Sequence, residues 1–358
     1  MYTYRQILAL GTMTLTSISV GFAYGHLSGL VRALQKHEDG ITLNEGQISL
    51  IAACMIFCCT VGITFLAFCG DSIGRRWCST LFSIPLLLSW ILVYFARGFI
   101  LLIASRILAG IAAGALTVLN LVAAAEFTSP KSRAFFQSIV SMVAPALGTG
   151  LGHAFGVIIH WRTLAIAGII LSAIHTCLPY FCVESPHWLA SRGKFDECEV
   201  AFQQLHGPKR SEAELRMLIK FESNKQKRTT VNNGFKKVVA AFRKRYLWVH
   251  AGPYPVMDIL LGEMFPLEIK LYCFLLSTPA VVSTVVAGIM FMPNLVTAIG
   301  YHGLFLLNSV ISCICMGYFW VTLPETKGKT LQEIEIYFKK NDFDECNVSF
   351  DDQVKTFI

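Results

Sequence analysis

Long apolar runs separated by short polar stretches dominate the first half of the chain. Each run approaches or exceeds the length of about 20 residues that an α-helix needs to cross the hydrocarbon core of a bilayer. Six such runs fill this half and two more follow near the end, so the pattern predicts eight membrane-spanning helices. Their expected positions are residues 6–27, 48–69, 78–96, 99–124, 136–159, 163–183, 272–293 and 302–323.

A polar stretch, residues 184–246, separates the two groups of apolar runs. Apolar residues recur at helical spacing within it, at 195–205 and at 212–221, which predicts two amphipathic helices. We therefore expect a loop that contains helices between two membrane parts.

The segment 246–266 is a poor membrane span, because it contains three prolines and the carboxylates Asp258 and Glu263. A carboxylate at the centre of a spanning helix costs about 2.5–3.5 kcal/mol on insertion scales. We expect this segment to be re-entrant or interfacial. Six plus two spans then bring the basic tail back to the side on which the chain begins.

Composition and charge agree with a membrane protein. Of the 358 residues, 54% are hydrophobic and 15% are charged, whereas a soluble protein averages about 25% charged residues. The net charge of +7 could suggest nucleic acid, but 14 of the 30 Lys and Arg residues lie within 184–246. Under the positive-inside rule that loop is cytoplasmic, and so are both termini. We predict an integral protein of the plasma membrane that binds no nucleic acid.

No sequence pattern supports an enzyme or a cofactor. The chain has no Gly-x-x-x-x-Gly-Lys-Ser/Thr loop for ATP, no Gly-x-Ser-x-Gly elbow and no His-Glu-x-x-His pair. Its 12 cysteines include no C-x-x-C pair with a matching partner pair, and many lie in apolar runs, so we interpret them as small buried hydrophobic residues. We predict neither a catalytic site, nor a cofactor, nor a bound metal.

Charged residues gather at three span ends on the predicted cytoplasmic side. The turn after the second span, residues 70–76, reads Gly-Asp-Ser-Ile-Gly-Arg-Arg, Glu126 closes the fourth span before Arg133, and Glu184 closes the sixth. Opposite charges on helix ends that pack together can form a network that locks one conformation and breaks in another. The alternative is that these charges only set topology at solvated loop ends.

Small and ionisable residues inside the spans have simpler interpretations. Glycines at helical spacing let helices approach closely, which needs no role in substrate binding. We expect Arg106, near the outer end of its span, to reach water by snorkelling, and the span histidines to be solvated or hydrogen-bonded, with a proton relay as the alternative. The residues concerned are Gly21, Gly25, Gly29, Gly110, Gly114, Gly148, Gly152, Gly156, His26, His153 and His175.

Taken together, these motifs resemble those of the sugar porter family of the major facilitator superfamily. The first span and the loop 41–46 are most similar to the insect trehalose-transporter-like branch. The matching motifs are Asp71-Ser-Ile-Gly-Arg-Arg76, Arg106-x-x-x-Gly110, Glu126-x-x-x-Pro130-x-x-Arg133, Glu184-Ser-Pro-His-Trp-Leu189, Gly262-Glu-Met-Phe-Pro266 and Pro324-Glu-Thr-Lys-Gly328.

The resemblance implies an all-α polytopic membrane protein with the major facilitator fold. Family members have twelve spans in two six-helix halves, and the substrate binds between the halves. This chain corresponds to a complete first half at 1–183, the cytoplasmic loop at 184–246, a truncated second half at 247–323 and a cytoplasmic tail at 324–358. We expect spans seven to nine of the family to be missing.

The resemblance also implies functional residues. In the second half, Lys270 replaces the usual Arg, and in the fifth span Ser141 stands where the family often has a sugar-binding Gln. The expected cytoplasmic gate in the first half is Asp71, Gly74, Arg75, Arg76, Glu126, Arg133 and Glu184, and its remnant in the second half is Glu263, Lys270 and Glu325. The expected substrate-lining residues are Phe22, His26 and Ser141.

Three functions follow from this resemblance. The first is facilitated transport of a sugar, trehalose or a hexose, by alternating access through the lipid bilayer. The second is a non-transporting truncated isoform that binds sugar or regulates a full-length porter as its partner. The third is transport of another small organic solute, which Ser141 leaves open.

Overall fold

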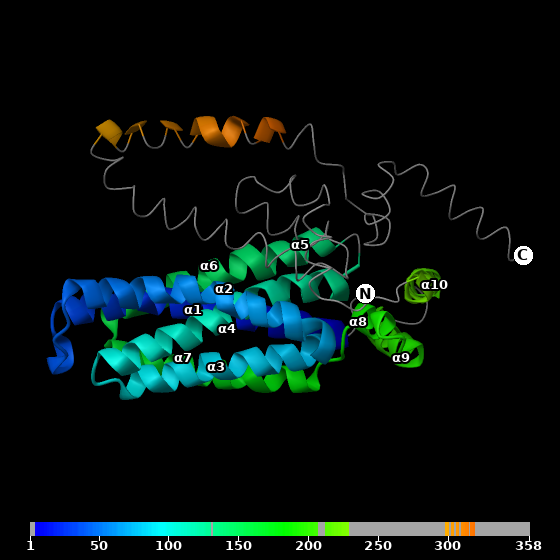
Figure 1. Cartoon of the computed structure of the whole chain (residues 1–358), viewed down its shortest axis with the longest axis horizontal. Coiled ribbons are helices and arrows are strands. Elements are labelled where there is room, and N and C mark those ends of the chain that lie inside the picture. Colours follow the sequence, from blue (N-terminus) through cyan, green and yellow to red (C-terminus); the bar gives the residue numbers. More distant parts are fainter. Residues whose placement is uncertain are drawn as a thin grey trace, which may run out of the picture. The chain divides into compact units, whose positions relative to one another are not determined.

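The computed structural model describes residues 4–129, 132–206 and 212–228, and short helical stretches between 298 and 318 (Figure 1). The chain forms two compact units, Met1–Asn232 and Asn233–Ile358. In the first unit the helices that form the spans lie side by side, and three loop helices lie at one end of them.

Six helices of the first unit are long and apolar enough to cross a membrane, which confirms the six spans predicted there. Two of them are composite: one contains a π-helical stretch, Ile139–Val143, and the other ends in the 3-10 turn Leu178–Phe181. The spans are α1 (Tyr4–Gln35), α2 (Glu45–Ile73), α3 (Arg75–Phe95), α4 (Phe99–Phe127), α5 with α6 (Arg133–Ser138 and Ala144–Ile158) and α7 (Trp161–Cys177) with the turn.

The first span is longer than predicted. The expected boundary at residue 27 was wrong, because Leu30, Ala33 and Leu34 remain buried and carry α1 to Gln35. The polar residues after 27 are therefore helical residues on the other side of α1. The connection to α2 is correspondingly short.

Close backbone contacts join α1 with α6, α2 with α4, and α3 with both α4 and α7. A methyl group on Gly25 would overlap the backbone oxygen of Thr149, and one on Gly114 would overlap the backbone oxygen of Cys59. The glycines therefore have the packing role predicted for them, since only residues without a Cβ allow the helices this near one another.

Arg106 does not snorkel to water, so that prediction was wrong. Its side chain is 2% exposed, its Nε donates to Ser105 Oγ at 3.4 Å, and its second guanidinium nitrogen, Nη1, has no hydrogen-bond partner among the described residues. The reason is that α4 packs against α1, α2 and α3. These helices therefore enclose the Arg106 side chain.

The loop after the sixth span folds as α8 (Pro186–Ser191), α9 (Phe195–His206) and α10 (Glu212–Arg228). This confirms the two predicted amphipathic helices and adds the short α8. Their apolar faces form one cluster of Leu189, Ala190, Cys198, Ala201, Phe202, Leu215 and Leu218.

In the second unit, an apolar helix at Ser309–Tyr318 lies within the span expected at 302–323. The expected span 272–293, the segment 246–266 and the tail 324–358 lie outside the described residues. The predicted boundaries of the domains stay predictions.

Candidate functional site: a buried charge cluster

A glycine turn brings the ends of α2 and α3 together. Gly74 joins the two helices with φ +98° and ψ 167°, a conformation that is essentially restricted to glycine. A methyl group there would also lie 2.6 Å from Glu184 Oε2. Glycine is thus required both by the backbone of the turn and by the carboxylate packed against it.

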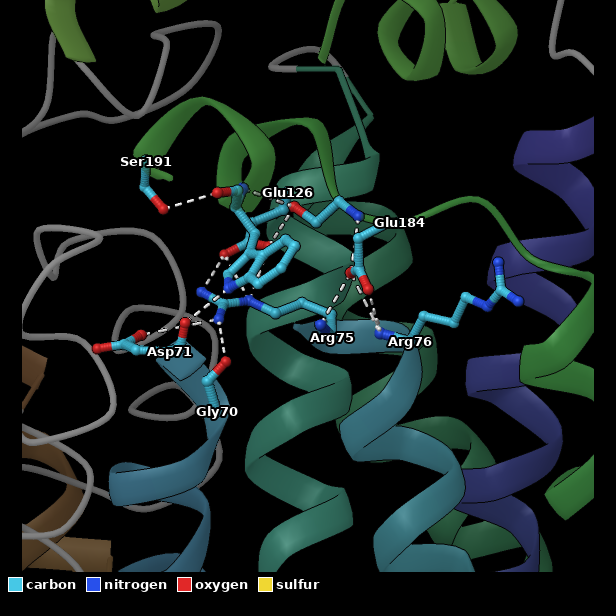
Figure 2. Close-up of polar contacts among 9 residues, drawn as sticks. Gly70, Asp71, Arg75, Arg76, Glu126, Glu184 and Ser191 are labelled. Atoms are coloured by element: carbon cyan, nitrogen blue, oxygen red, sulfur yellow. Dashed lines mark hydrogen bonds and ion pairs between the residues drawn. The ribbon is translucent and has the colours of Figure 1, made fainter. Parts of the chain in front are cut away.

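Arg75, the first residue of α3, forms a buried ion pair with Glu126 near the end of α4 (Figure 2). Its Nε lies 3.1 Å from Oε2 and its Nη2 lies 3.0 Å from Oε1, a two-point contact between the guanidinium and the carboxylate. The side chains are 5% and 0% exposed. Nη1 donates to the Gly70 carbonyl at 2.9 Å and lies 3.7 Å from Asp71 Oδ1.

Glu184 accepts hydrogen bonds at the beginning of α3. Its Oε1 accepts from the backbone N–H groups of Arg75 at 2.8 Å, Arg76 at 3.2 Å and Ser185 at 2.9 Å. A carboxylate at this end of a helix is favoured by the helix dipole. Burial raises the pKa of the Glu184 carboxyl above its usual value, and the three N–H donors oppose that shift.

Ser185 and Trp188 tie α8 to the same cluster. Ser185 Oγ donates to Glu126 Oε2 at 2.6 Å and accepts from the backbone N–H of Trp188 at 3.3 Å. Trp188 Nε1 donates to the Asp71 carbonyl at 2.8 Å. The cluster therefore links the α2–α3 turn, the end of α4 and the start of α8 in one network (Figure 2).

The structure brings most of the predicted first-half gate residues together, but not the side chain of Arg76. That side chain points away from Glu126 and Asp71 (Figure 2). Its guanidinium lies instead against the rings of Trp77 and Tyr180, and Arg76 Cζ is 5.2 Å and 5.4 Å from their centroids. Only the backbone N–H of Arg76 joins the cluster.

Of the remaining predicted gate residues, Arg133 lies among the described residues and the other three do not. Arg133 is 4% exposed at the first position of α5. Glu263, Lys270 and Glu325 lie outside the described residues. The gating role of the whole set stays a prediction.

Two interactions of the cluster were not predicted, those of Ser185 and Trp188. A signal for Ser185 was present in the sequence, because serine followed by proline is typical of a helix start. The side chain of Ser185 caps α8 as that pattern indicates. For the indole contact of Trp188 with the Asp71 carbonyl, the sequence offered no comparable signal.

A small cavity of about 30 Å³, partly open to solvent, lies beside the cluster between α1, α3, α4 and residues 179–183. Arg75, Arg76 and Ser79 line it on α3, and apolar side chains line most of the rest. Asn120 closes part of its wall by donating to Ser17 Oγ at 3.2 Å. A cavity of this size has room for one or two water molecules.

The three predicted substrate-lining residues do not line that cavity. Phe22 and His26 are buried against Trp90, with ring centroids 5.6 Å and 5.0 Å from it, and His26 Nε2 lies 3.0 Å from the Trp161 carbonyl. Ser141 Oγ donates to the Gln137 carbonyl at 2.7 Å. These are packing contacts, and the substrate-lining role stays a prediction.

Within the described parts of the chain, no group of three His, Cys, Asp or Glu side chains is arranged to hold a metal ion. The cluster itself pairs two carboxylates with cationic or N–H donors. Its chemistry is therefore that of a closed ion-pair network, which can hold helix ends together.

Comparison with solved structures shows the major facilitator fold. The proton:xylose symporter XylE of E. coli, bound to 6-bromo-6-deoxy-D-glucose, superposes with a TM-score of 0.77 at 16% identity. The alignment covers 93% of this chain and 99% of that one. At this identity the likeness concerns the fold alone.

Curated plant proteins are similar in sequence. Sugar transporter ERD6-like 9 of Arabidopsis thaliana is 30% identical over 194 residues, which are 53% of this chain and 57% of that protein. Sugar transporter ERD6-like 10 is 32% identical over 204 residues, 56% of this chain and 43% of that protein. The chain spans about half the length of the curated relatives it matches.

The family model described as "Sugar (and other) transporter" matches residues 10–249 and 227–338, well over half of the chain. The six apolar helices of the first unit agree with this match. The chain is therefore an integral membrane protein with the major facilitator fold, and it belongs to the sugar transporter family, a family of transporters and not of enzymes.

Proposed function

We propose that this chain moves a small sugar down its gradient across the membrane by alternating access, with the buried charge cluster as a cytoplasmic latch. The observation that carries the proposal is the two-point Arg75–Glu126 pair, whose side chains are at most 5% exposed, at one end of six membrane-spanning helices. Membership of the sugar transporter family supports the class of substrate.

The cluster has the properties that a latch requires. It joins three chain segments that are distant in sequence, the α2–α3 turn, the end of α4 and the start of α8. A buried pair of opposite charges is either closed or separated and rehydrated, because a partly opened buried pair leaves an uncompensated charge. Such an element switches between two states and can distinguish two conformations of a carrier.

The second half of the latch is proposed to come from Glu263, Lys270 and Glu325, and the sugar to contact Phe22, His26 and Ser141. The termini and the loop 184–246 would face the cytoplasm, and the plasma membrane is the proposed location. Trehalose or a hexose is the proposed substrate, because the first span and the loop 41–46 resemble the trehalose-transporter-like branch.

Uptake into liposomes that contain only this chain tests the proposal. We expect saturable entry of labelled trehalose or D-glucose, with competition by the unlabelled sugar. If a non-sugar organic solute competes for uptake and sugars do not, the substrate is another organic solute and not a sugar. Uptake no faster than in protein-free liposomes, from folded protein, would refute independent transport.

One observation favours a second function, that of a non-transporting isoform which binds a full-length porter. The chain spans about half the length of the relatives it matches, and the family model matches it in two pieces that overlap at 227–249. Both facts support the proposal that spans seven to nine of the family are missing where the two matches meet. Co-purification with a longer porter, together with no uptake by the chain alone, would favour this function, and saturable uptake by the chain alone would exclude it.

A further inference from the structure

Arg76 carries a guanidinium group without a counter-ion among the described residues. Its Nε is buried and has no hydrogen-bond partner, and no described carboxylate lies within 4.0 Å of the guanidinium. Its neighbour Arg75 takes both the Glu126 contact and the Asp71 contact. A cation that the described residues leave without an anion is suited to bind one from outside.

The surroundings of Arg76 are those of a membrane interface. Trp77 and Tyr180, the two rings near its guanidinium, are 49% and 62% exposed and form an edge-to-face pair with centroids 6.3 Å apart. Tryptophan and tyrosine are enriched where a membrane protein passes from hydrocarbon to headgroups. The pair also attracts the guanidinium through cation–π contacts, which hold it at this level.

The helix surface beyond Trp77 is apolar and exposed. Leu81, Ile84 and Leu88 follow Trp77 on α3 at helical spacing, and each is between 43% and 45% exposed. A continuous exposed apolar stripe on a spanning helix is a lipid-facing surface. Arg76 therefore stands at the end of a surface that acyl chains cover.

The cavity beside the charge cluster, about 30 Å³, is too small for an acyl chain, so the apolar part of a ligand of Arg76 would lie on the exposed stripe of α3. An anion with an attached apolar chain satisfies both the guanidinium and this stripe, whereas a free, strongly hydrated anion satisfies only the guanidinium. The chemistry that fits is that of a phosphodiester headgroup on a lipid.

We propose that Arg76, with Trp77 and Tyr180, binds the phosphate of an anionic phospholipid at the end of the helices that carries the charge cluster. Because the backbone N–H of Arg76 is held by Glu184 at 3.2 Å, a lipid bound there sits directly beside the network. This site is independent of whether the chain transports sugar.

Native mass spectrometry of the full chain tests the site. The purified protein is titrated with dioleoyl phosphatidylglycerol, with dioleoyl phosphatidylcholine, or with inorganic phosphate. We expect at least one phosphatidylglycerol to bind in preference to phosphatidylcholine. In Arg76→Gln we expect that affinity to be about tenfold weaker, the scale of one lost charge-assisted contact.

Arg192→Gln is the matched control, because Arg192 also lies near a tryptophan ring, 6.0 Å from that of Trp188, but follows α8 in the loop. We expect it to bind phosphatidylglycerol like the wild type. If Arg76→Gln does not fold, Tyr180→Leu keeps the cation and should weaken binding about two- to fivefold. If Arg76→Gln folds and binds phosphatidylglycerol as the wild type does, the proposal is overturned. If Arg76→Gln does not fold, the same result in Tyr180→Leu overturns it. So does displacement of the lipid by millimolar inorganic phosphate, which would make this a site for the free ion.

Discussion

Replacing Glu126 by glutamine tests how much the buried Arg75–Glu126 ion pair contributes to the stability of the fold. Glutamine has nearly the shape of glutamate, so the change removes the charge and leaves the Arg75 guanidinium buried at 5% exposure. Breaking a buried pair by neutralising one partner destabilises a protein by about 3–5 kcal/mol, because the remaining charge is uncompensated. Asp71, 3.7 Å from Arg75 and 30% exposed, is too far and too solvated to replace the lost carboxylate fully.

The chain offers a control pair of nearly the same length at the surface. Lys194 Nζ lies 2.9 Å from Glu197 Oε1, against 3.0 Å for Arg75 and Glu126, but its side chains are 51% and 60% exposed. Solvent screens such a pair, so Glu197→Gln should change stability by about 0–1 kcal/mol. The two substitutions remove the same charge at the same distance and differ mainly in burial.

Thermal unfolding of the purified protein in detergent, followed by the loss of monodisperse protein on heating, measures both variants beside the wild type. We expect a marked fall in the midpoint for Glu126→Gln and almost none for Glu197→Gln. The double variant Arg75→Met with Glu126→Gln should recover part of the loss, since it leaves no unpaired charge. Equal midpoints for the two single variants would refute the reasoning, because burial would then not control the strength of the pair.

Three further predictions concern the turn, the helix contacts and the protonation of the cluster. Gly74→Ala should destabilise the protein by about 1–3 kcal/mol for its backbone conformation alone, and should also displace the Glu184 carboxylate, which can be followed by the unfolding midpoint. Gly25→Ala should cost about 1–3 kcal/mol, because the added methyl overlaps the backbone of Thr149, whereas Gly11→Ala, with no atom within 4 Å, should be neutral or slightly stabilising in the same assay. Because burial raises the pKa of the Glu184 carboxyl, the folded state binds the carboxyl proton more tightly than the unfolded chain does. The folded state therefore loses stability as the pH rises from the ordinary pKa of glutamate to the raised pKa of Glu184. On acidification through that window the wild type should therefore gain stability relative to Glu184→Gln, and an unfolding series in pH that shows a relative loss would contradict the assignment.

Much of the first half could be predicted from the sequence, because a span of about 20 apolar residues is a one-dimensional signal. The charge cluster could be predicted from the sequence for a related reason. Arg75, Glu126 and Glu184 each end or begin a span on the same predicted side, so the topology alone brings them to one level. Their pairing confirms the proximity that the pattern predicted.

The direction of individual side chains could not be predicted from the sequence in the same way. Arg75 and Arg76 are adjacent in the sequence, but adjacent residues of a helix do not face the same neighbour. One side chain therefore reaches Glu126 while the other lies near Tyr180. Arg106 was misjudged for a comparable reason, because its distance from the span end says nothing about how closely other helices surround α4.

The central proposal is that opening of the Arg75–Glu126 pair accompanies sugar transport by this chain. Its most direct test is the exchange of labelled D-glucose and trehalose across liposomes that contain only the wild type, Glu126→Gln or Glu197→Gln. We predict saturable exchange by the wild type, a changed maximal rate for Glu126→Gln and wild-type exchange for Glu197→Gln. Exchange that is no faster than in empty liposomes, or a rate that is the same in all three folded proteins, would contradict the account.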